Sequence, residues 1–171
     1  ALLDNERSVV SSISGTTRDV IKEKVLFNND EYQIIDTAGV PRHKQKNQID
    51  RYASSLSINQ LEYSLVALIV VDSTIGISFE DLRLINECIV NNVTPILILN
   101  KWDLLDTENK ENINNHIKKK LKKFDWINIL RISALTKKGI NLINTSLKEV
   151  NNQLQIRIST SDLNIFLREI W

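Results

Sequence analysis

Residues 95–103 have the sequence Pro-Ile-Leu-Ile-Leu-Asn-Lys-Trp-Asp (PILILNKWD). This stretch gives the clearest indication of the fold class. Its apolar first half is typical of a strand buried on both faces of a parallel sheet. The polar residues Asn100 to Asp103 follow at once, at the carboxyl end of that strand. Ligands bind at this edge of open α/β sheets. The stretch therefore predicts an α/β protein with a polar site after residue 99.

The patterns on either side of this stretch extend the same fold. Four more segments have strand patterns: apolar runs at 65–71 and 127–132, and alternating segments at 20–27 and 31–36 around the turn sequence at 28–30. Apolar residues recur at helical steps of three and four in 79–89, 113–124 and 140–154. Strands that alternate with helices predict a doubly wound, mostly parallel sheet.

The composition excludes several classes of protein. With 171 residues, 42% of them hydrophobic, the chain can bury one sizeable core. No apolar run is long enough to cross a bilayer, and no signal sequence opens the chain. A single cysteine excludes a disulfide framework, and a net charge of +1 gives no global attraction to nucleic acid or to a membrane. We expect a cytoplasmic protein without a membrane partner.

The segment Asp36-Thr37-Ala38-Gly39 (DTAG) ends an expected strand with a second polar site. The Asp36 carboxylate can hold Mg²⁺ through water, and Gly39 lets a backbone N–H approach a phosphate oxygen closely. Taken alone, the same four residues are equally compatible with an ordinary polar turn after a strand.

Asp103 has the chemistry needed to select guanine. A carboxylate accepts two parallel hydrogen bonds from the N1–H and N2–H₂ edge of guanine, and adenine does not offer that pair. Asn100 can tie neighbouring loops together and contact the base N7, while the stem of Lys101 lies over the ring. The alternative is a charged turn in which Asp103 caps the following helix. The DTAG segment some 60 residues earlier favours the nucleotide interpretation.

Two further segments fit the same site. Ser133-Ala134-Leu135 follows the last expected strand, where a backbone N–H could meet guanine O6. Gly15-Thr16-Thr17-Arg18-Asp19 precedes the hairpin, and the Thr17 hydroxyl is a hard oxygen ligand suited to Mg²⁺. Each signal is weak by itself, but the order of all four segments matches a GTPase domain.

The chain resembles the translation-factor-related GTPases and, among them, the second G domain of the Der (EngA) family of ribosome-assembly GTPases. The resemblance covers essentially the whole chain. Five segments carry it: Gly15–Asp19 (GTTRD), Asp36–Val40 (DTAGV), Asn100–Leu104 (NKWDL), Ser133–Leu135 (SAL) and Arg157–Leu167 (RISTSDLNIFL). The tryptophan within NKWD and the last segment separate it from tRNA-modification GTPases. The resemblance implies a P-loop GTPase fold that binds GTP or GDP with Mg²⁺ and hydrolyses GTP.

The same resemblance assigns roles to the residues. Thr17 is expected to bind Mg²⁺ and sense the γ-phosphate during hydrolysis, and Asp36 to hold Mg²⁺ through water. The nucleotide-binding residues are expected to be Asp36, Thr37, Ala38, Gly39, Val40, Asn100, Lys101, Asp103, Ser133 and Ala134. Val40 stands where Ras-like GTPases have a catalytic glutamine. Relatives with an aliphatic residue there often use K⁺, so K⁺ dependence is a further hypothesis.

The phosphate-binding loop G-x-x-x-x-G-K-[ST] is absent from this stretch, whose glycines stand only at positions 15, 39, 76 and 139. By the resemblance, the loop and the first strand precede Ala1, so the domain is expected to be N-terminally truncated. Losing three or more charge-assisted hydrogen bonds, at about 1.5–3 kcal/mol each, weakens affinity by about 10³- to 10⁶-fold. We expect these residues alone to bind GTP poorly. We also expect a gap between the strands that end at Asp36 and Asp72.

The resemblance divides the chain into a partial G domain at 1–155 and the start of a KH-like domain at 156–171. It implies an upstream G domain, a downstream KH-like domain, and a role in large ribosomal subunit assembly with rRNA as partner. Two alternatives remain open: a tRNA-modification GTPase domain, and a non-enzymatic RNA-binding scaffold with a defective nucleotide site. A basic helical face, formed by His116, Lys118, Lys119, Lys120, Lys122 and Lys123, is either simply solvated or contacts rRNA phosphates.

Overall fold

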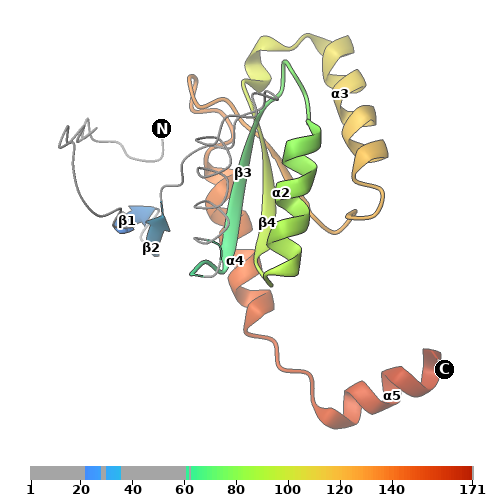
Figure 1. The fold of residues 1–171 in the computed structure, drawn as a ribbon. Helices are drawn as coiled ribbons and strands as arrows, with labels where there is room; N and C mark the ends of the chain where they lie inside the picture. The colour runs from blue at the N-terminus through green and yellow to red at the C-terminus, as the bar shows by residue number, and fades with distance from the viewer. Residues whose placement is uncertain (1–21, 28–29, 36–60, 62, 171) are drawn as a thin grey trace, which may run out of the picture.

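The computed structural model describes residues 22–27, 30–35, 61 and 63–170 (Figure 1). The described elements follow the order β1, β2, β3, α2, β4, η1, α3, β5, α4 and α5. Their bounds are β1 Lys22–Phe27, β2 Asp30–Ile35, β3 Val66–Asp72, α2 Phe79–Val90, β4 Thr94–Asn100, the 3₁₀ turn η1 Trp102–Leu104, α3 Thr107–Lys120, β5 Asn128–Arg131, α4 Asn141–Leu154 and α5 Thr160–Ile170. The alternation of strands and helices confirms the predicted α/β class.

A parallel sheet of order β3-β4-β5 forms the centre of the fold. The central strand β4 is buried from Pro95 to Leu99, as its apolar sequence predicts. The register pairs Asp72 with Asn100 and Leu99 with Arg131, so the carboxyl ends of the three strands lie side by side. The loops that follow these strands therefore meet at one edge of the sheet.

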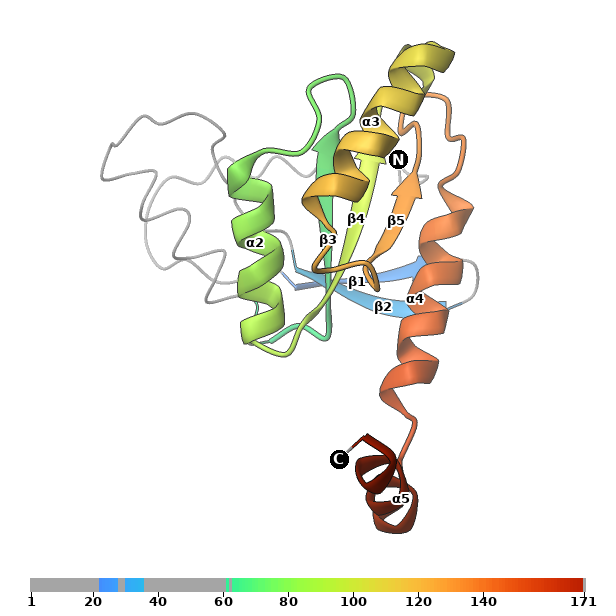
Figure 2. The same cartoon turned by 90° about the vertical axis from the view of Figure 1, so that its right-hand side faces the viewer.

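Helices cover both faces of this sheet (Figure 2). Leu97 and Leu99 of β4 pack in a cluster with Ile85 of α2 and Ile117 of α3. The alternate residues of β4 face the other way: Ile96 and Ile98 pack with Ile143 and Val150 of α4. The alternation of side chains along a strand thus puts α2 and α3 on one face and α4 on the other, which confirms the doubly wound arrangement.

The strands β1 and β2 form a separate antiparallel hairpin, in which Phe27 pairs with Asp30. Asp30, expected in the turn, is instead the first residue of β2, and that strand ends at Ile35. The hairpin contacts α4, because Tyr32 Oη donates to Asn144 Oδ1 at 2.8 Å and Lys148 Nζ lies 2.8 Å from Asp30 Oδ2. Among the described strands β2 is not paired with β3, and the expected gap between them stays a prediction.

The helices match their predicted positions with differences at the ends. Phe79, expected on the buried stripe of α2, is 75% exposed because it opens the helix. Ser78 caps that helix by accepting from the N–H of Asp81, whose carboxylate in turn accepts from the N–H of Ser78. Phe124, expected at the end of α3, follows the helix, which ends at Lys120.

The last helix, α5, begins as its sequence predicts, with Ser159 Oγ accepting from the N–H of Asp162 at 3.1 Å. Its apolar residues Leu163, Phe166 and Ile170 are exposed. Figure 1 shows α5 set apart from the sheet, joined to α4 by an extended segment. None of the described helices is both long enough and apolar enough to span a bilayer.

Candidate functional site

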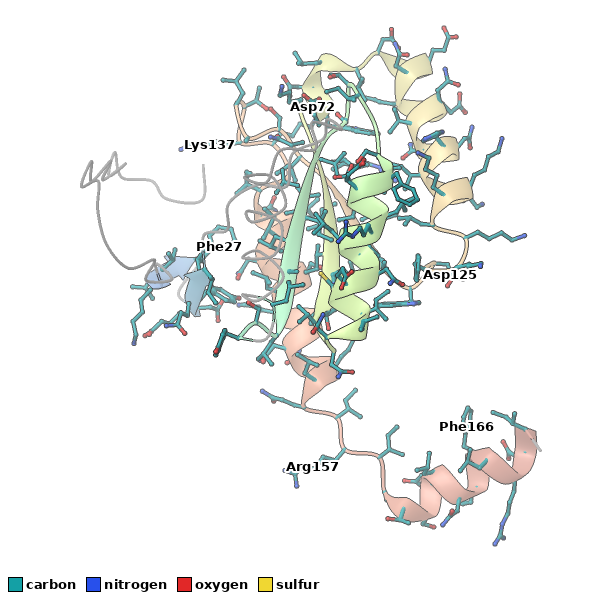
Figure 3. All side chains as sticks on the ribbon, in the orientation of Figure 1. Phe27, Asp72, Asp125, Lys137, Arg157 and Phe166 are labelled. Atoms are coloured by element: carbon teal, nitrogen blue, oxygen red, sulfur yellow. The ribbon has the colours of Figure 1, made fainter. Side chains whose placement is uncertain are left out.

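The loops after β3, β4 and β5 bring several of the predicted site residues together. Asn100 is the last residue of β4, Lys101 and Asp103 follow it directly, and Ser133 and Ala134 lie in the loop after β5. Figure 3 labels Asp72, the last residue of β3, at this same end of the sheet. The remaining predicted residues, Thr17 and Asp36 to Val40, lie outside the described residues.

Asn100 links the two loops, as the sequence predicts. Its Oδ1 accepts from the N–H of Lys101 at 2.8 Å and from the N–H of Ala134 at 2.9 Å. A backbone hydrogen bond from the N–H of Trp102 to the carbonyl of Ile132, at 3.1 Å, joins the same loops. A backbone N–H of the Ser133–Leu135 segment was expected to meet guanine O6; that of Ala134 is directed at Asn100, and a base would have to share or replace this acceptor.

The Asp103 side chain is placed so that it can bind a ligand. It lies within η1 and is exposed. Its carboxylate makes no hydrogen bond or ion pair with any other residue that the structure describes. The alternative role, capping the next helix, belongs to Asp106, whose Oδ1 accepts from the N–H of Asn109 at 2.8 Å. The Asp103 carboxylate is therefore available to a ligand.

The loop after β5 is held by its own backbone. The buried Ser133 donates its N–H to the carbonyl of Lys138 at 2.9 Å and accepts from the N–H of Thr136 at 3.0 Å. Gly139 closes the loop with a φ of +78°, and a Cβ added there would lie 2.6 Å from the carbonyl oxygen of Arg131. Only glycine fits both the backbone angle and the space. Gly139 therefore lets the loop that carries Ala134 pass close to the Arg131 carbonyl.

Asp72 also lies at this edge of the sheet, although its sequence context did not mark it as a site residue. Its Oδ2 lies 2.7 Å from Lys101 Nζ, and its Oδ1 accepts from the N–H and the hydroxyl of Thr74 at 2.9 and 2.7 Å. Hydrogen bonds from Lys101 and Thr74 lower the pKa of Asp72 from 3.8 to about 2. Asp72 is an acidic residue at the end of the strand next to the one that ends in Asn100. That position could have indicated that Asp72 belongs to the site.

Two further contacts support the loop after β4. Buried Ser73 donates both its N–H and its hydroxyl to the carbonyl of Asn100, at 2.9 and 2.7 Å. The Arg131 guanidinium lies 5.5 Å from the ring centroid of Trp102 and donates twice to Asn114 Oδ1, at 3.0 and 2.7 Å. Neither contact has a local sequence signal, because each joins residues that are far apart in the chain.

The arrangement suits a planar heterocycle that carries N–H donors. Asp103 offers two acceptor oxygens at the edge of the site, and the stem of Lys101 supplies apolar surface beside it. Among the described residues no group of three His, Cys, Asp or Glu side chains is placed to hold a metal ion. The predicted Mg²⁺ ligands Thr17 and Asp36 are outside those residues.

Sequence comparison gives one family and a set of relatives. The family model described as 50S ribosome-binding GTPase matches residues 1–101. The protein named GTPase Der from Chlorobium chlorochromatii is 36% identical over 173 residues, which cover 99% of this chain and 39% of the relative. GTPase Der from Finegoldia magna is 32% identical and covers 95% of this chain. The chain thus spans about 39% of the length of the first relative.

Solved structures share the fold. A crystal structure of Era in complex with MgGDPNP and part of 16S ribosomal RNA has a TM-score of 0.65 and 26% identity, covering 86% of this chain and 49% of Era. Aquifex aeolicus Era bound to GDP·AlF₄⁻ has a TM-score of 0.64, 26% identity and coverage of 86% and 50%. The elongation factor SelB from Methanococcus maripaludis, at 20% identity and a TM-score of 0.64, covers 84% and 30% and shares the fold alone.

Proposed function

This chain belongs to the family of 50S ribosome-binding GTPases, and from this premise we propose that it supplies the guanine-binding half of a GTP-hydrolysing switch that acts in large ribosomal subunit assembly. The observation that carries the proposal is the exposed carboxylate of Asp103, which has no partner among the described residues, beside a loop that Asn100 fixes. A carboxylate so placed selects a base that presents two adjacent N–H donors, and guanine does so.

Each residue after β4 has its own part in binding the base. Asp103 accepts from guanine N1–H and N2–H₂, and the stem of Lys101 lies against the ring. Asn100 keeps Lys101 and Ala134 in register through its two hydrogen bonds of 2.8 and 2.9 Å. A backbone N–H of the Ser133–Leu135 segment would donate to O6; that of Ala134, now bonded to Asn100 Oδ1, would have to be shared with the base. A base without these two donors would cover the Asp103 carboxylate without satisfying it, and its binding would be weaker.

The phosphate side of the site is assigned to residues outside the described part of the chain. Thr17 and Asp36 would hold Mg²⁺, and the segment Thr37 to Val40 would meet the γ-phosphate. Mg²⁺, when bound, neutralises the charge that develops on the phosphate oxygens during hydrolysis. K⁺ dependence of hydrolysis belongs to the same proposal, since Val40 cannot orient water by hydrogen bonding.

The cellular role is inferred from the family and from similar proteins. The family is described as 50S ribosome-binding, and the Era structure contains both a Mg-bound GTP analogue and ribosomal RNA. We infer a cytoplasmic protein whose partners are the large subunit and its rRNA. Residues 1–155 then form part of a G domain, and 156–171 begin a KH-like domain.

Equilibrium titration of the full-length protein with fluorescent GTP and ATP analogues tests the proposal. We expect GTP to bind at least 100-fold more tightly than ATP. The isolated 171-residue stretch should bind both analogues poorly, for lack of a phosphate-binding loop. Equal affinity of the full-length protein for the two analogues would refute guanine selection. No binding of either would favour an RNA-binding scaffold.

A further inference from the structure

The ion pair between Asp72 and Lys101 joins the ends of two neighbouring strands. Lys101 Nζ lies 2.7 Å from Asp72 Oδ2, although the lysine side chain is 53% exposed. The other oxygen, Oδ1, accepts from both the N–H and the hydroxyl of Thr74. The carboxylate is thus held from one side by Thr74 and directs its remaining oxygen at Lys101.

The backbone of Lys101 is also held in one conformation. Its φ of 62° lies in the left-handed region, which a lysine seldom adopts. Such a conformation persists when the surroundings fix it, and these residues cluster at functional sites. Here the N–H donates to Asn100 Oδ1 at 2.8 Å, while the ammonium is bound to Asp72. Both ends of the lysine are therefore anchored.

The two residues that hold Lys101, Asp72 and Asn100, lie opposite each other at the end of the sheet. Asp72 and Asn100 are paired in the parallel register of β3 and β4. Ser73, the next residue, donates two hydrogen bonds to the carbonyl of Asn100. Asp72 therefore cannot move relative to Lys101 without breaking contacts at the end of the sheet.

We propose that Asp72 is a positioning residue of the guanine site: it binds the Lys101 ammonium and thereby holds the lysine stem across the face of the base, beside Asp103. This inference rests on the proposed function. A lysine side chain that is free in solution loses conformational entropy when a ligand orders it. Because the ion pair already orders Lys101, less entropy is lost when the nucleotide binds. Asp72 so adds affinity for the nucleotide, while the choice of base stays with Asp103.

Titration of the full-length protein with fluorescent GDP tests this role. Asp72→Asn keeps the size and an acceptor for Thr74 but loses the charge, and it should weaken GDP binding about three- to tenfold. Lys101→Met should also weaken binding. The double variant should bind no more weakly than Lys101→Met alone, because Asp72 acts through the ammonium. A purely structural role would give additive losses instead.

The base edge supplies a second readout. Inosine diphosphate lacks the 2-amino group of guanine, so the ratio of GDP to IDP affinity reports the contact with Asp103. Asp72→Asn should lower both affinities by the same factor and leave this ratio unchanged. A changed ratio would contradict a role through the lysine stem. Asp103→Asn should alter the ratio. If another G domain of the full-length protein also binds nucleotide, the sites whose affinity changes in this variant are those formed by Asp103 and its neighbours.

Asp125→Asn is the matched control, because it removes the same charge from an exposed residue before β5, at the other end of the sheet (Figure 3). It should leave the GDP affinity unchanged. If Asp72→Asn does not fold, Thr74→Val removes one donor to the same carboxylate and should weaken binding about twofold, again only with Lys101 present.

These measurements distinguish a failure of the Asp72 role from a failure of guanine binding itself. Wild-type affinity for GDP in Asp72→Asn, or additive losses with Lys101→Met, would overturn this inference and leave the proposed function standing. Failure of the wild-type protein to bind guanine nucleotides would instead refute the proposed function, and this inference with it.

Discussion

Asn100 shows how one side chain can connect two loops of the site. Its Oδ1 accepts from Lys101 in its own loop and from Ala134 in the next. The sequence predicted this connection, because an asparagine at the end of a buried strand has both the position and the acceptor for it. The partner of Lys101 was not predicted, since an ion pair across two strands depends on the register of the sheet.

Substitution of Asn100 by Ala removes the acceptor of both loops. We expect the free energy of unfolding to fall by about 1–3 kcal/mol, because the two N–H groups lose their partner. Asn100→Asp keeps an oxygen at that place and should retain most of the stability. Urea unfolding of both variants measures the difference. Equal stability of the Ala variant and the wild type would contradict the linking role.

Asp72 should make stability depend on pH. Its pKa in the folded protein is about 2, below the usual 3.8, because Lys101 and Thr74 stabilise the charged form. A lowered pKa contributes stability that is present above pH 4 and is lost as the pH falls toward 2. The contribution should be about 1–2 kcal/mol after allowance for the exposed lysine.

Urea unfolding of the wild type and Asp72→Asn at several pH values measures this contribution. The difference between the two proteins should be largest near pH 6 and should shrink between pH 4 and pH 2. A difference that stays constant over this range would show that the Asp72 charge adds nothing to stability.

At the scale of elements, the helices and strands follow from apolar spacing, while their ends depend on contacts. The stripe at 79–89 predicted α2, but the exposure of Phe79 follows from the Ser78 cap that places it in the first turn. The apolar run at 127–132 predicted β5, which is shorter, at Asn128–Arg131. Loop geometry was the least predictable level, because the positive φ of Gly139 has no local pattern.

Two glycines with similar backbone angles allow a matched test of the β5–α4 loop. Gly139 has a φ of +78° and no room for a Cβ, whereas a Cβ at Gly76, with a φ of +81°, would meet only Ile113 Cδ1 at 3.4 Å. Gly76→Ala should cost about 1 kcal/mol from backbone strain. Gly139→Ala should cost clearly more and also weaken GDP binding, because the backbone next to Ala134 must shift.

Urea unfolding and GDP titration of the two glycine variants give the comparison. Equal losses of stability would show that the contact with the Arg131 carbonyl is relieved without cost. A Gly139→Ala variant with normal GDP affinity would show that this loop takes no part in the site.

At the scale of the whole molecule, the doubly wound sheet could be predicted because buried strands and amphipathic helices alternate along the chain. The docking of the β1–β2 hairpin on α4 could not, because it depends on contacts such as Tyr32 with Asn144. The division at residue 155 and the role of the exposed α5 stay predictions. The phosphate-binding residues also stay predictions, since Thr17 and Asp36 lie outside the described part of the chain.

Cys88 reports on the integrity of this core. The thiol is 1% exposed between α2 and the sheet, and burial raises its pKa to about 11. It is the one cysteine of the 171 residues. In a protein whose other cysteines are replaced, alkylation at pH 8 should therefore be slow in the folded state and should follow unfolding in urea. Rapid alkylation without urea would contradict the packing of α2 on the sheet.

Asp103→Asn should exchange the base preference of the site from guanine toward xanthine. An asparagine amide can donate to the 2-carbonyl of xanthine, whereas a carboxylate repels that oxygen and needs the 2-amino group of guanine. In the full-length protein, the variant should lose about 10- to 100-fold in GDP affinity at this site and gain affinity for xanthosine diphosphate. Asp106→Asn, which keeps its helix cap, should bind as the wild type does. An Asp103→Asn variant with unchanged GDP affinity and no affinity for xanthosine diphosphate would contradict guanine recognition by this residue.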